Sequence, residues 1–367
     1  MAIFKPNTIE EAIAAVRQSG RILPVGGRTK NGLCLTQDTC NHIDLRAMAR
    51  VVEYEPTEFT VTATAGTSLK VLQELLAENR QCLPFDPPFS GSGATLGGAI
   101  SSGLNGSSSL RFGGARDFIL GVRWIDGTGE HVFAGGKVVK NAAGFDLPKF
   151  FVGSCGRFGV LTEITLKVFP RPTRYATLLF SGNRSQRVAY LKKIDSSPLE
   201  IEAIDLTEDG LMVRLGGAEK TVITMQKRIE ALVDEVPAEL LLDDSEASYW
   251  RDVGEFLWAE SATLIKVPCL IDQLDTLHAM VQDNGLKSRV SLAGQVMYIA
   301  MAKETSDPSA SQASNLGAKL NHQGFPYQCF RTESAVEFPL PPAPHTGDSK
   351  FSRHIKLALD PKGRFAG

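Results

Sequence analysis

The 367-residue sequence lacks several features that would narrow its function directly. No stretch approaches the roughly 20 consecutive apolar residues of a membrane-spanning helix, and the N-terminal MAIFKPN is no secretory signal because no basic region precedes an apolar run. The net charge of −2 creates no whole-molecule field that would favour nucleic acid. The sequence therefore predicts a cytoplasmic globular protein.

Cysteine is sparse and scattered. The six cysteines form no Cys-x-x-Cys pair, which disfavours an iron–sulfur or zinc site within this chain. Scattered thiols are typical of a reducing compartment. Cys155 lies between small residues with no histidine near it in sequence, and we interpret it as a space-filling residue rather than a nucleophile.

Glycine, in contrast, is concentrated in one region. Residues 91–159 hold 17 of the 34 glycines. They follow no Gly-X-Y period and alternate with apolar residues, which excludes a collagen-like helix and a flexible linker. Dense glycine in an apolar sequence indicates backbone in unusual conformations, or backbone that something approaches closely.

Hydrophobic periodicity predicts two α+β domains, with a boundary at Pro170-Arg171-Pro172. Before the boundary we expect helices at 8–19 and 69–80, strands at 21–25, 42–45, 51–54, 59–65 and 160–169, and a hairpin over 122–133. After it we expect strands at 176–181, 199–206, 210–215, 262–268 and 289–301, and helices at 184–195, 219–235, 245–258, 271–283 and 309–321. A tail helix is predicted at 350–359. No internal sequence repeat is apparent.

The proline-rich segment 338–348 favours an exposed loop or linker. A polyproline segment that binds a partner is the alternative.

The loop Pro24-Val25-Gly26-Gly27-Arg28-Thr29-Lys30-Asn31-Gly32 follows a predicted strand. Consecutive N–H groups in such a turn can form an anion-binding nest, with two cations and a hydroxyl beside them. A Walker A loop is excluded because Leu33-Cys34 replaces the required Lys-Ser/Thr pair. A glycine turn with incidental surface cations is the alternative.

The segment 87–103 (PPFSGSGATLGGAISSG) offers small side chains and hydroxyls on which a flat aromatic ligand can lie. Three residues separate Gly93 and Gly97, so this is not the Gly-x-Gly-x-x-Gly of a Rossmann site. A tightly packed glycine surface is the other interpretation. Two more glycine-rich groups follow, at 111–121 and 140–163, and in the first Arg116 and Asp117 could form a structural ion pair.

In this order the motifs resemble the FAD-binding domain of the vanillyl-alcohol oxidase / p-cresol methylhydroxylase (PCMH-type) flavoproteins. The stretch VVKNAAGFDLPKFFVGSCGRFGVLTEI narrows the resemblance to the family of FAD-binding E subunits of bacterial glycolate oxidase (glycolate dehydrogenase). The likeness covers residues 1 to about 172. It implies an α+β fold with a PCMH-type FAD-binding domain at 1–172, a smaller ferredoxin-like α+β cap domain at 173–340, and a proline-rich loop and C-terminal helix at 341–367.

The resemblance also implies a site and partners. The residues that would bind FAD by analogy are Gly26, Gly27, Arg28, Thr29, Lys30, Thr95, Gly97, Gly98, Ser101, Ser102, Arg116, Asp117, Phe118, Gly153, Ser154, Gly159 and Val160. The family oxidises a small 2-hydroxyacid by hydride transfer to flavin, in a complex with a D-type FAD subunit and an iron–sulfur F subunit. The location would be cytoplasmic, or peripheral at the membrane through that complex.

Departures from the family sharpen these expectations. No histidine occurs from 43 to 130 or in the 24–32 loop, where covalent members tether their flavin, so we predict non-covalent FAD. Related dehydrogenases carry His-x-Gly-Asp-Gly-Asn for substrate and metal, and we interpret His345-Thr346-Gly347-Asp348-Ser349 as a coincidental match. No metal site and no catalytic base are assigned, since His278, His322 and His354 are solitary. Three hypotheses remain: a glycolate dehydrogenase subunit, a self-sufficient dehydrogenase of another 2-hydroxyacid or alcohol, and a non-catalytic structural subunit.

Overall fold

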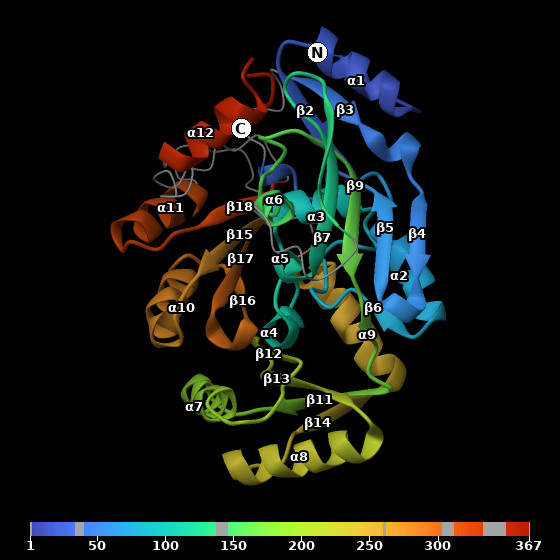
Figure 1. Ribbon diagram of the computed structural model, residues 1–367. Coiled ribbons are helices and arrows are strands. Elements are labelled where there is room, and N and C mark those ends of the chain that lie inside the picture. Colours follow the sequence, from blue (N-terminus) through green and yellow to red (C-terminus); the bar gives the residue numbers. More distant parts are fainter. Residues whose placement is uncertain are drawn as a thin grey trace. The chain divides into compact units, whose positions relative to one another are not determined.

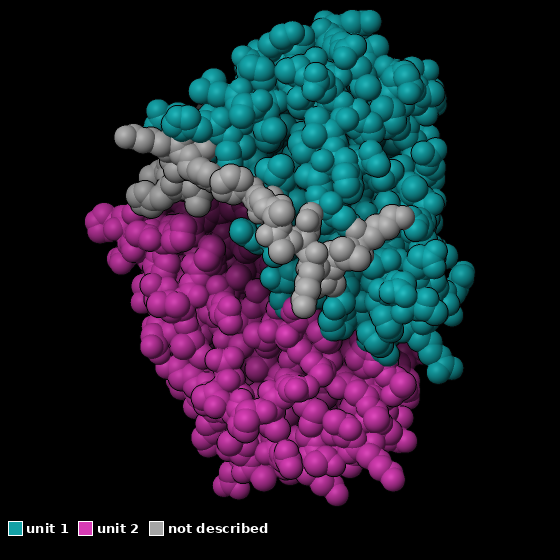
Figure 2. All heavy atoms as spheres, in the orientation of Figure 1, with its two compact units in different colours: residues 1–106, 113–171, 345–367 teal, residues 107–112, 172–344 magenta. Residues whose placement is uncertain are grey.

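The computed structural model describes residues 2–33, 40–136, 146–259, 262–302, 312–332 and 350–366 (Figure 1). Its contacts divide the chain into two compact units, which Figure 2 colours separately. Unit 1 contains residues 1–106, 113–171 and 345–367, and unit 2 contains residues 107–112 and 172–344. The division into folding domains at 172/173 and 340/341 stays a prediction.

Unit 1 begins with a small parallel sheet in the order β1 (Ile3–Phe4), β3 (Asn41–Asp44) and β2 (Ile22–Val25). Helix α1 (Ile9–Gln18) lies between β1 and β2 along the chain and begins at Thr8, whose hydroxyl accepts from the Glu11 N–H at 3.2 Å. Strand β2 leads directly into the Gly26-Gly27 loop. The sheet therefore fixes where that loop begins.

The C-terminal tail completes this part of unit 1. After α12 (Lys350–Leu359), Phe365 forms a parallel bridge with Ile22 of β2. The guanidinium of Arg364 donates to the carbonyl oxygens of Val16, Arg17 and Ser19, which close helix α1. The predicted tail helix is confirmed, and the residues after it belong to the same unit as the N-terminus.

A five-stranded antiparallel sheet forms the larger part of unit 1. Its order is β4 (Val51–Glu55), β5 (Thr60–Thr64), β9 (Val160–Lys167), β7 (Ile119–Ile125) and β8 (His131–Gly135). Strands β7 and β8 confirm the predicted hairpin. The other elements are α2 (Leu69–Glu78), β6 (Gln81–Cys82), α3 (Leu96–Ser102), α5 (Ala115–Phe118), α6 (Leu147–Phe150) and β10 (Phe169–Pro170).

Unit 2 is built on an eight-stranded antiparallel sheet in the order β14-β11-β13-β12-β16-β17-β15-β18. The strands are β11 (Arg174–Phe180), β12 (Ala203–Leu206), β13 (Leu211–Gly217), β14 (Glu239–Leu242), β15 (Ala262–Pro268), β16 (Lys287–Ser291), β17 (Val296–Ala302) and β18 (Gln328–Arg331). The helices are α4 (Ser109–Phe112), α7 (Arg184–Asp195), α8 (Glu219–Val233), α9 (Asp243–Gly254), α10 (Leu274–Asp283) and α11 (Gln312–His322).

This sheet consists of two halves with the same topology. Each runs β-α-β-β-α-β, from β11 to β14 and from β15 to β18, which is the ferredoxin-like arrangement. The second strand of each half, β12 and β16, pairs with the other through Leu206 and Val290. The duplication leaves no repeat in the sequence, because a core face specifies apolar character at alternate positions and not particular residues.

In unit 2 the sequence interpretation was wrong at one strand and did not predict two others. Residues 289–301 form two strands rather than one, because Leu292, Ala293 and Gly294 all adopt positive φ and turn the chain back. The edge strands β14 and β18 were not predicted, since four-residue edge strands carry little periodicity.

A network of charged and hydroxyl groups lies where the two halves of the unit 2 sheet meet. Asp205, fully buried on β12, accepts from Arg289 Nε at 2.7 Å and from the hydroxyls of Ser291 and Ser107 at 2.8 and 2.9 Å. We call Ser107, Asp205, Arg289 and Ser291 the seam network. Ser107 comes from the 107–112 segment, so the network ties that segment to the sheet.

Candidate functional site

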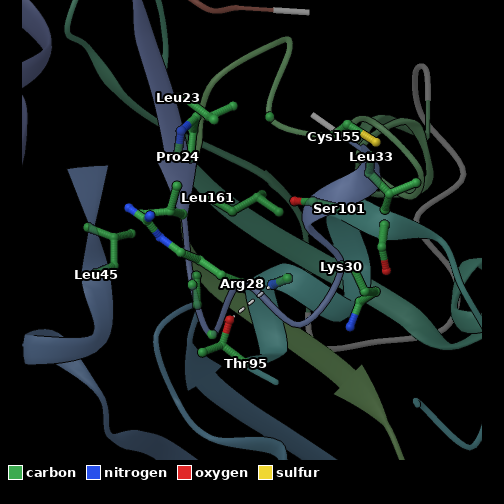
Figure 3. Close-up of a pocket in the computed structure, with 18 of the residues that line it drawn as sticks. Leu23, Pro24, Arg28, Lys30, Leu33, Leu45, Thr95, Ser101, Cys155 and Leu161 are labelled. Carbon is green, nitrogen blue, oxygen red and sulfur yellow. Dashed lines mark hydrogen bonds between the residues drawn. The ribbon is translucent and has the colours of Figure 1, made fainter. Parts of the chain in front are cut away.

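A pocket in unit 1 brings together five separate stretches of sequence (Figure 3). They are β2 with the loop after it, Leu45, the Ala65-Gly66 turn, helix α3 with the residue before it, and the turn that leads into β9 with the start of that strand. The lining residues are Leu23, Pro24, Val25, Gly26, Gly27, Arg28, Thr29, Lys30, Asn31, Leu33, Leu45, Ala65, Gly66, Thr95, Gly97, Gly98, Ser101, Ser102, Cys155, Gly156, Gly159 and Leu161.

The Gly26-Gly27 turn packs directly against the residues before α3. A Cβ on Gly26 would lie 2.2 Å from Thr95 Oγ1, and a Cβ on Gly27 would lie 1.8 Å from the carbonyl oxygen of Gly93. Side chains at these positions would push two pocket walls apart. Gly26 and Gly27 are therefore needed for close packing of the loop against residues 93–95. This packing also brings two walls of the pocket together.

Thr95 organises the opposite wall. It is the N-cap of α3, and its Oγ1 accepts from the Gly98 N–H at 3.2 Å, drawn as the dashed line in Figure 3. The carbonyl of Ser101 accepts from the Cys155 N–H at 2.8 Å, which joins α3 to the turn before β9. The Ser102 hydroxyl donates a hydrogen bond to the carbonyl oxygen of Ala99 at 2.9 Å. Ser101 rather than Ser102 therefore has its hydroxyl available to the pocket.

The loop from Gly27 to Lys30 supplies donors and positive charge. No backbone carbonyl among the described residues accepts from the N–H groups of Gly27, Arg28 or Thr29. Arg28 has a left-handed backbone (φ 54°), and its Nη2 lies 2.7 Å from His42 Nδ1. The Lys30 ammonium lies 3.3 Å from Thr29 Oγ1 and 5.5 Å from the centre of the Phe89 ring. In Figure 3 Arg28 extends toward Leu45 and Lys30 extends on the other side of the loop.

The charge and the aliphatic surface of the lining residues favour a ligand with an anionic part and an apolar part. Among the described residues that line the pocket, two are cationic and none is a carboxylate. Leu23, Leu33, Leu45 and Leu161 add aliphatic surface. A dinucleotide with a negatively charged pyrophosphate and a flat ring system fits this combination. The donor set of the pocket therefore fits FAD.

Six of the residues that the resemblance implied do not line this pocket: Arg116, Asp117, Phe118, Gly153, Ser154 and Val160. Phe118 is buried and stacks with Phe85, and Val160 is buried where β9 begins. Asp117 accepts from the N–H of Gly114 and makes no described ion pair with its exposed neighbour Arg116. Their roles toward a cofactor stay predictions.

The structure also adds lining residues that sequence reasoning missed. Leu45, Ala65, Gly66 and Leu161 come from segments that we interpreted only as strands or turns. Their alternating apolar pattern could have indicated the core but not which side chains face a pocket. Cys155 lines it too, with φ 50°, and burial raises the pKa of its thiol, which argues against a thiolate nucleophile. Residues 140–145, the proline-rich 338–348 segment and the His345 string lie outside the described residues.

Comparisons with known proteins agree with this fold. Residues 1–135 match the family model described as FAD binding domain. Alkyldihydroxyacetonephosphate synthase superposes on 98% of this chain and 75% of its own, with a TM-score of 0.74 at 18% identity. The 4-ethylphenol oxidase from Gulosibacter chungangensis superposes on 99% of this chain and 87% of its own, with a TM-score of 0.73 at 14% identity. Residues 1–135 therefore match an FAD-binding domain, and the chain as a whole has the fold of these two proteins.

Two of the curated relatives are glycolate oxidase subunits. Over 180 residues the chain is 39% identical to the glycolate oxidase subunit GlcE of Escherichia coli K12, which is 49% of this chain and 51% of that protein. Over 161 residues it is 32% identical to the glycolate oxidase subunit GlcD of Bacillus subtilis 168, covering 43% and 34% of the two chains. The match thus spans about half the length of GlcE and less of the other. Helices long and apolar enough to cross a bilayer do not occur in the part of the chain that the structure describes.

Proposed function

We propose that the chain binds FAD non-covalently in the pocket of unit 1. The observation that carries this proposal is a lining with two cations, no described carboxylate and three loop N–H donors that meet no backbone acceptor among the described residues. The FAD-binding match over residues 1–135 supports it, because that match contains the loop and α3.

Each part of the pocket has a distinct task in this proposal. Thr29, Lys30 and the N–H groups of the loop bind the pyrophosphate, and Arg28 adds positive charge beside it. Gly97, Gly98 and Ser101 on α3 present backbone and a hydroxyl to the rest of the cofactor. Leu45 and Leu161 exclude water from its apolar part. When bound, FAD supplies the hydride acceptor for oxidation of a hydroxyl-bearing carbon.

We further propose that the chain is the FAD-binding subunit of a glycolate dehydrogenase complex, together with a D-type FAD subunit and an iron–sulfur F subunit. Its similarity to GlcE supports this assignment. The sequence holds no Cys-x-x-Cys pair, which suits onward electron transfer to a cluster held by a partner. The described lining also holds no histidine or carboxylate that could take the substrate proton. Relay of electrons therefore suits this site better than direct attack on substrate.

Expression of the chain alone and with D-type and F-type partners tests the proposal. We expect the isolated chain to retain a yellow flavin chromophore that denaturation releases, and glycolate-dependent dye reduction to appear only in the complex. Turnover by the isolated chain would instead favour a self-sufficient dehydrogenase. A folded chain without flavin would favour a structural subunit.

A further inference from the structure

The pocket arginine is held by a buried histidine. His42 is 1% exposed on β3, where it pairs in register with Leu23 of β2, and its backbone N–H donates to the carbonyl of Ala2 at 2.9 Å. The side chain thus comes from a hydrogen-bonded strand that cannot shift freely. Its Nδ1 lies 2.7 Å from Arg28 Nη2.

The chemistry of this contact fixes the state of the imidazole. A guanidinium carries five N–H donors and no acceptor. His42 Nδ1 must therefore be an unprotonated acceptor, and the contact joins a cation to a neutral ring. Arg28 is held in place without being neutralised by this contact.

This contact differs from those of Arg214 and Arg289 in unit 2. Arg289 meets Asp205 at 2.7 Å, and Arg214 meets Glu246 at 2.7 Å. A carboxylate cancels the field of the arginine that it orients. A neutral acceptor orients the arginine and leaves its charge for a ligand.

The hydrogen bond between His42 and Arg28 also bears on the backbone conformation of Arg28. A non-glycine residue in the left-handed region costs about 1–2 kcal/mol relative to the right-handed one. With Gly27 packed against Gly93, the hydrogen bond to His42 holds the loop in that conformation.

We propose that His42 is a positioning residue for the cofactor: it anchors Arg28 and the 26–30 loop to β3 through a neutral acceptor, so that the guanidinium keeps its charge for the pyrophosphate. The inference rests on the proposed binding of FAD. It assigns His42, which does not line the pocket, an effect on affinity that acts through Arg28.

A double-mutant cycle on the FAD dissociation constant of the full chain tests this role. Flavin fluorescence would be titrated for wild type, H42A, R28M and the double variant, with thermal unfolding to check that each is folded. We expect H42A to weaken binding by about tenfold, as for a lost hydrogen bond to a charged group. In the R28M background the same change should have less than about a twofold effect. An undiminished tenfold effect there would overturn the proposal.

Two further replacements of His42 distinguish the orientation of the Arg28 guanidinium from its charge. They can be interpreted even if H42A does not fold. In H42N the amide oxygen sits about where Nδ1 sits, so binding should stay within about threefold of wild type. In H42D the acceptor is kept but Arg28 is neutralised, so binding should weaken by about tenfold or more. Equal affinity of H42D and wild type would overturn the charge argument. If wild type itself bound no FAD, the proposed function would fail rather than this inference.

Discussion

The pocket of unit 1 and the seam network of unit 2 differ in how donors and acceptors are matched. In the seam, Arg289 and two serine hydroxyls converge on the single carboxylate of Asp205, so donors meet acceptors within the protein. In the pocket, the cations Arg28 and Lys30 face no lining carboxylate among the described residues, and loop N–H groups meet no backbone carbonyl there. A balanced set of buried polar groups stabilises a fold, whereas the unbalanced set of the pocket, with two cations and no described lining carboxylate, suits an anionic ligand.

The same comparison separates the roles of similar residues. Arg214 and Arg289 are partly or fully buried and Arg28 is exposed, and each of the three arginines lies within hydrogen-bond reach of an acceptor. Arg214 and Arg289 each meet a carboxylate, whereas the acceptor at Arg28 Nη2 is a neutral imidazole, and of the three only Arg28 lines the pocket. Residue type therefore indicates less about function than the charge of the partner does.

Removing the carboxylate of the seam network should have the largest effect, on the free energy of unfolding. Asp205→Ala leaves the guanidinium of Arg289, 7% exposed, buried without its carboxylate. We expect the free energy of unfolding to fall by about 3–5 kcal/mol, measured by urea denaturation. The matched control Ser291→Ala removes one neutral donor and should cost about 1 kcal/mol. Equal losses for the two variants would contradict the view that charge balance holds the seam.

A side chain added at the glycine turn of the pocket should lower the affinity for FAD more than it lowers the stability of the fold. Gly27→Ala places a Cβ 1.8 Å from the Gly93 carbonyl oxygen and forces the loop away from α3. Because overpacking costs about 1–3 kcal/mol, we expect FAD affinity to fall by about tenfold or more, measured by fluorescence titration. Gly20→Ala is the control, since a Cβ there would meet nothing within 4 Å beyond its chain neighbours, and this variant should bind FAD as wild type does. Normal affinity of Gly27→Ala would contradict the assigned cradle.

Removing a cation from the pocket should lower the affinity for FAD and make that affinity less dependent on salt concentration. Lys30→Met is expected to lower FAD affinity by about tenfold, as for loss of one charge-assisted contact to phosphate, and to flatten the decrease in affinity with added salt. Arg116→Met is the matched control because Arg116 is exposed and outside the pocket. If both variants lose affinity equally, the cofactor extends to Arg116, as the family resemblance implied.

The smallest effect is expected at Cys155. Burial raises the pKa of its thiol, so the thiolate fraction near neutral pH is below that of an ordinary cysteine. Alkylation of Cys155 by iodoacetamide, followed by mass spectrometry, should therefore be slower than that of glutathione at the same pH. Cys155→Ser should keep FAD affinity within about threefold, because the thiol donates no charge to the pocket. Faster alkylation than glutathione would indicate an activated thiol and contradict the space-filling interpretation.

Sequence reasoning predicted the local elements well where patterns are strong. The periodicity of residues 8–19 and the alternation in residues 160–169 predicted helix α1 and strand β9, because periodicity is a local property. The family resemblance implied ten of the residues that line the first two walls, from Gly26 to Lys30 and from Thr95 to Ser102.

What sequence reasoning missed depends on long-range packing. Nothing local to Leu45 or His42 indicates that β3 passes beside the 26–30 loop, since that requires the parallel pairing of β2 and β3. The duplicated sheet of unit 2 was hidden for the same reason. Likewise Arg116 and Asp117 carry the residue types of a binding motif, but their exposure and their place outside the pocket walls appear only in three dimensions.

The most direct test of the central claim is the cofactor content of the full chain purified without added flavin. The unbalanced pocket predicts one FAD per chain, a visible flavin spectrum, and complete release of the yellow colour into the filtrate after denaturation. A folded chain that neither contains FAD nor binds it on titration would contradict the claim that unit 1 is a cofactor site. Colour that stays with the denatured protein would contradict the non-covalent attachment.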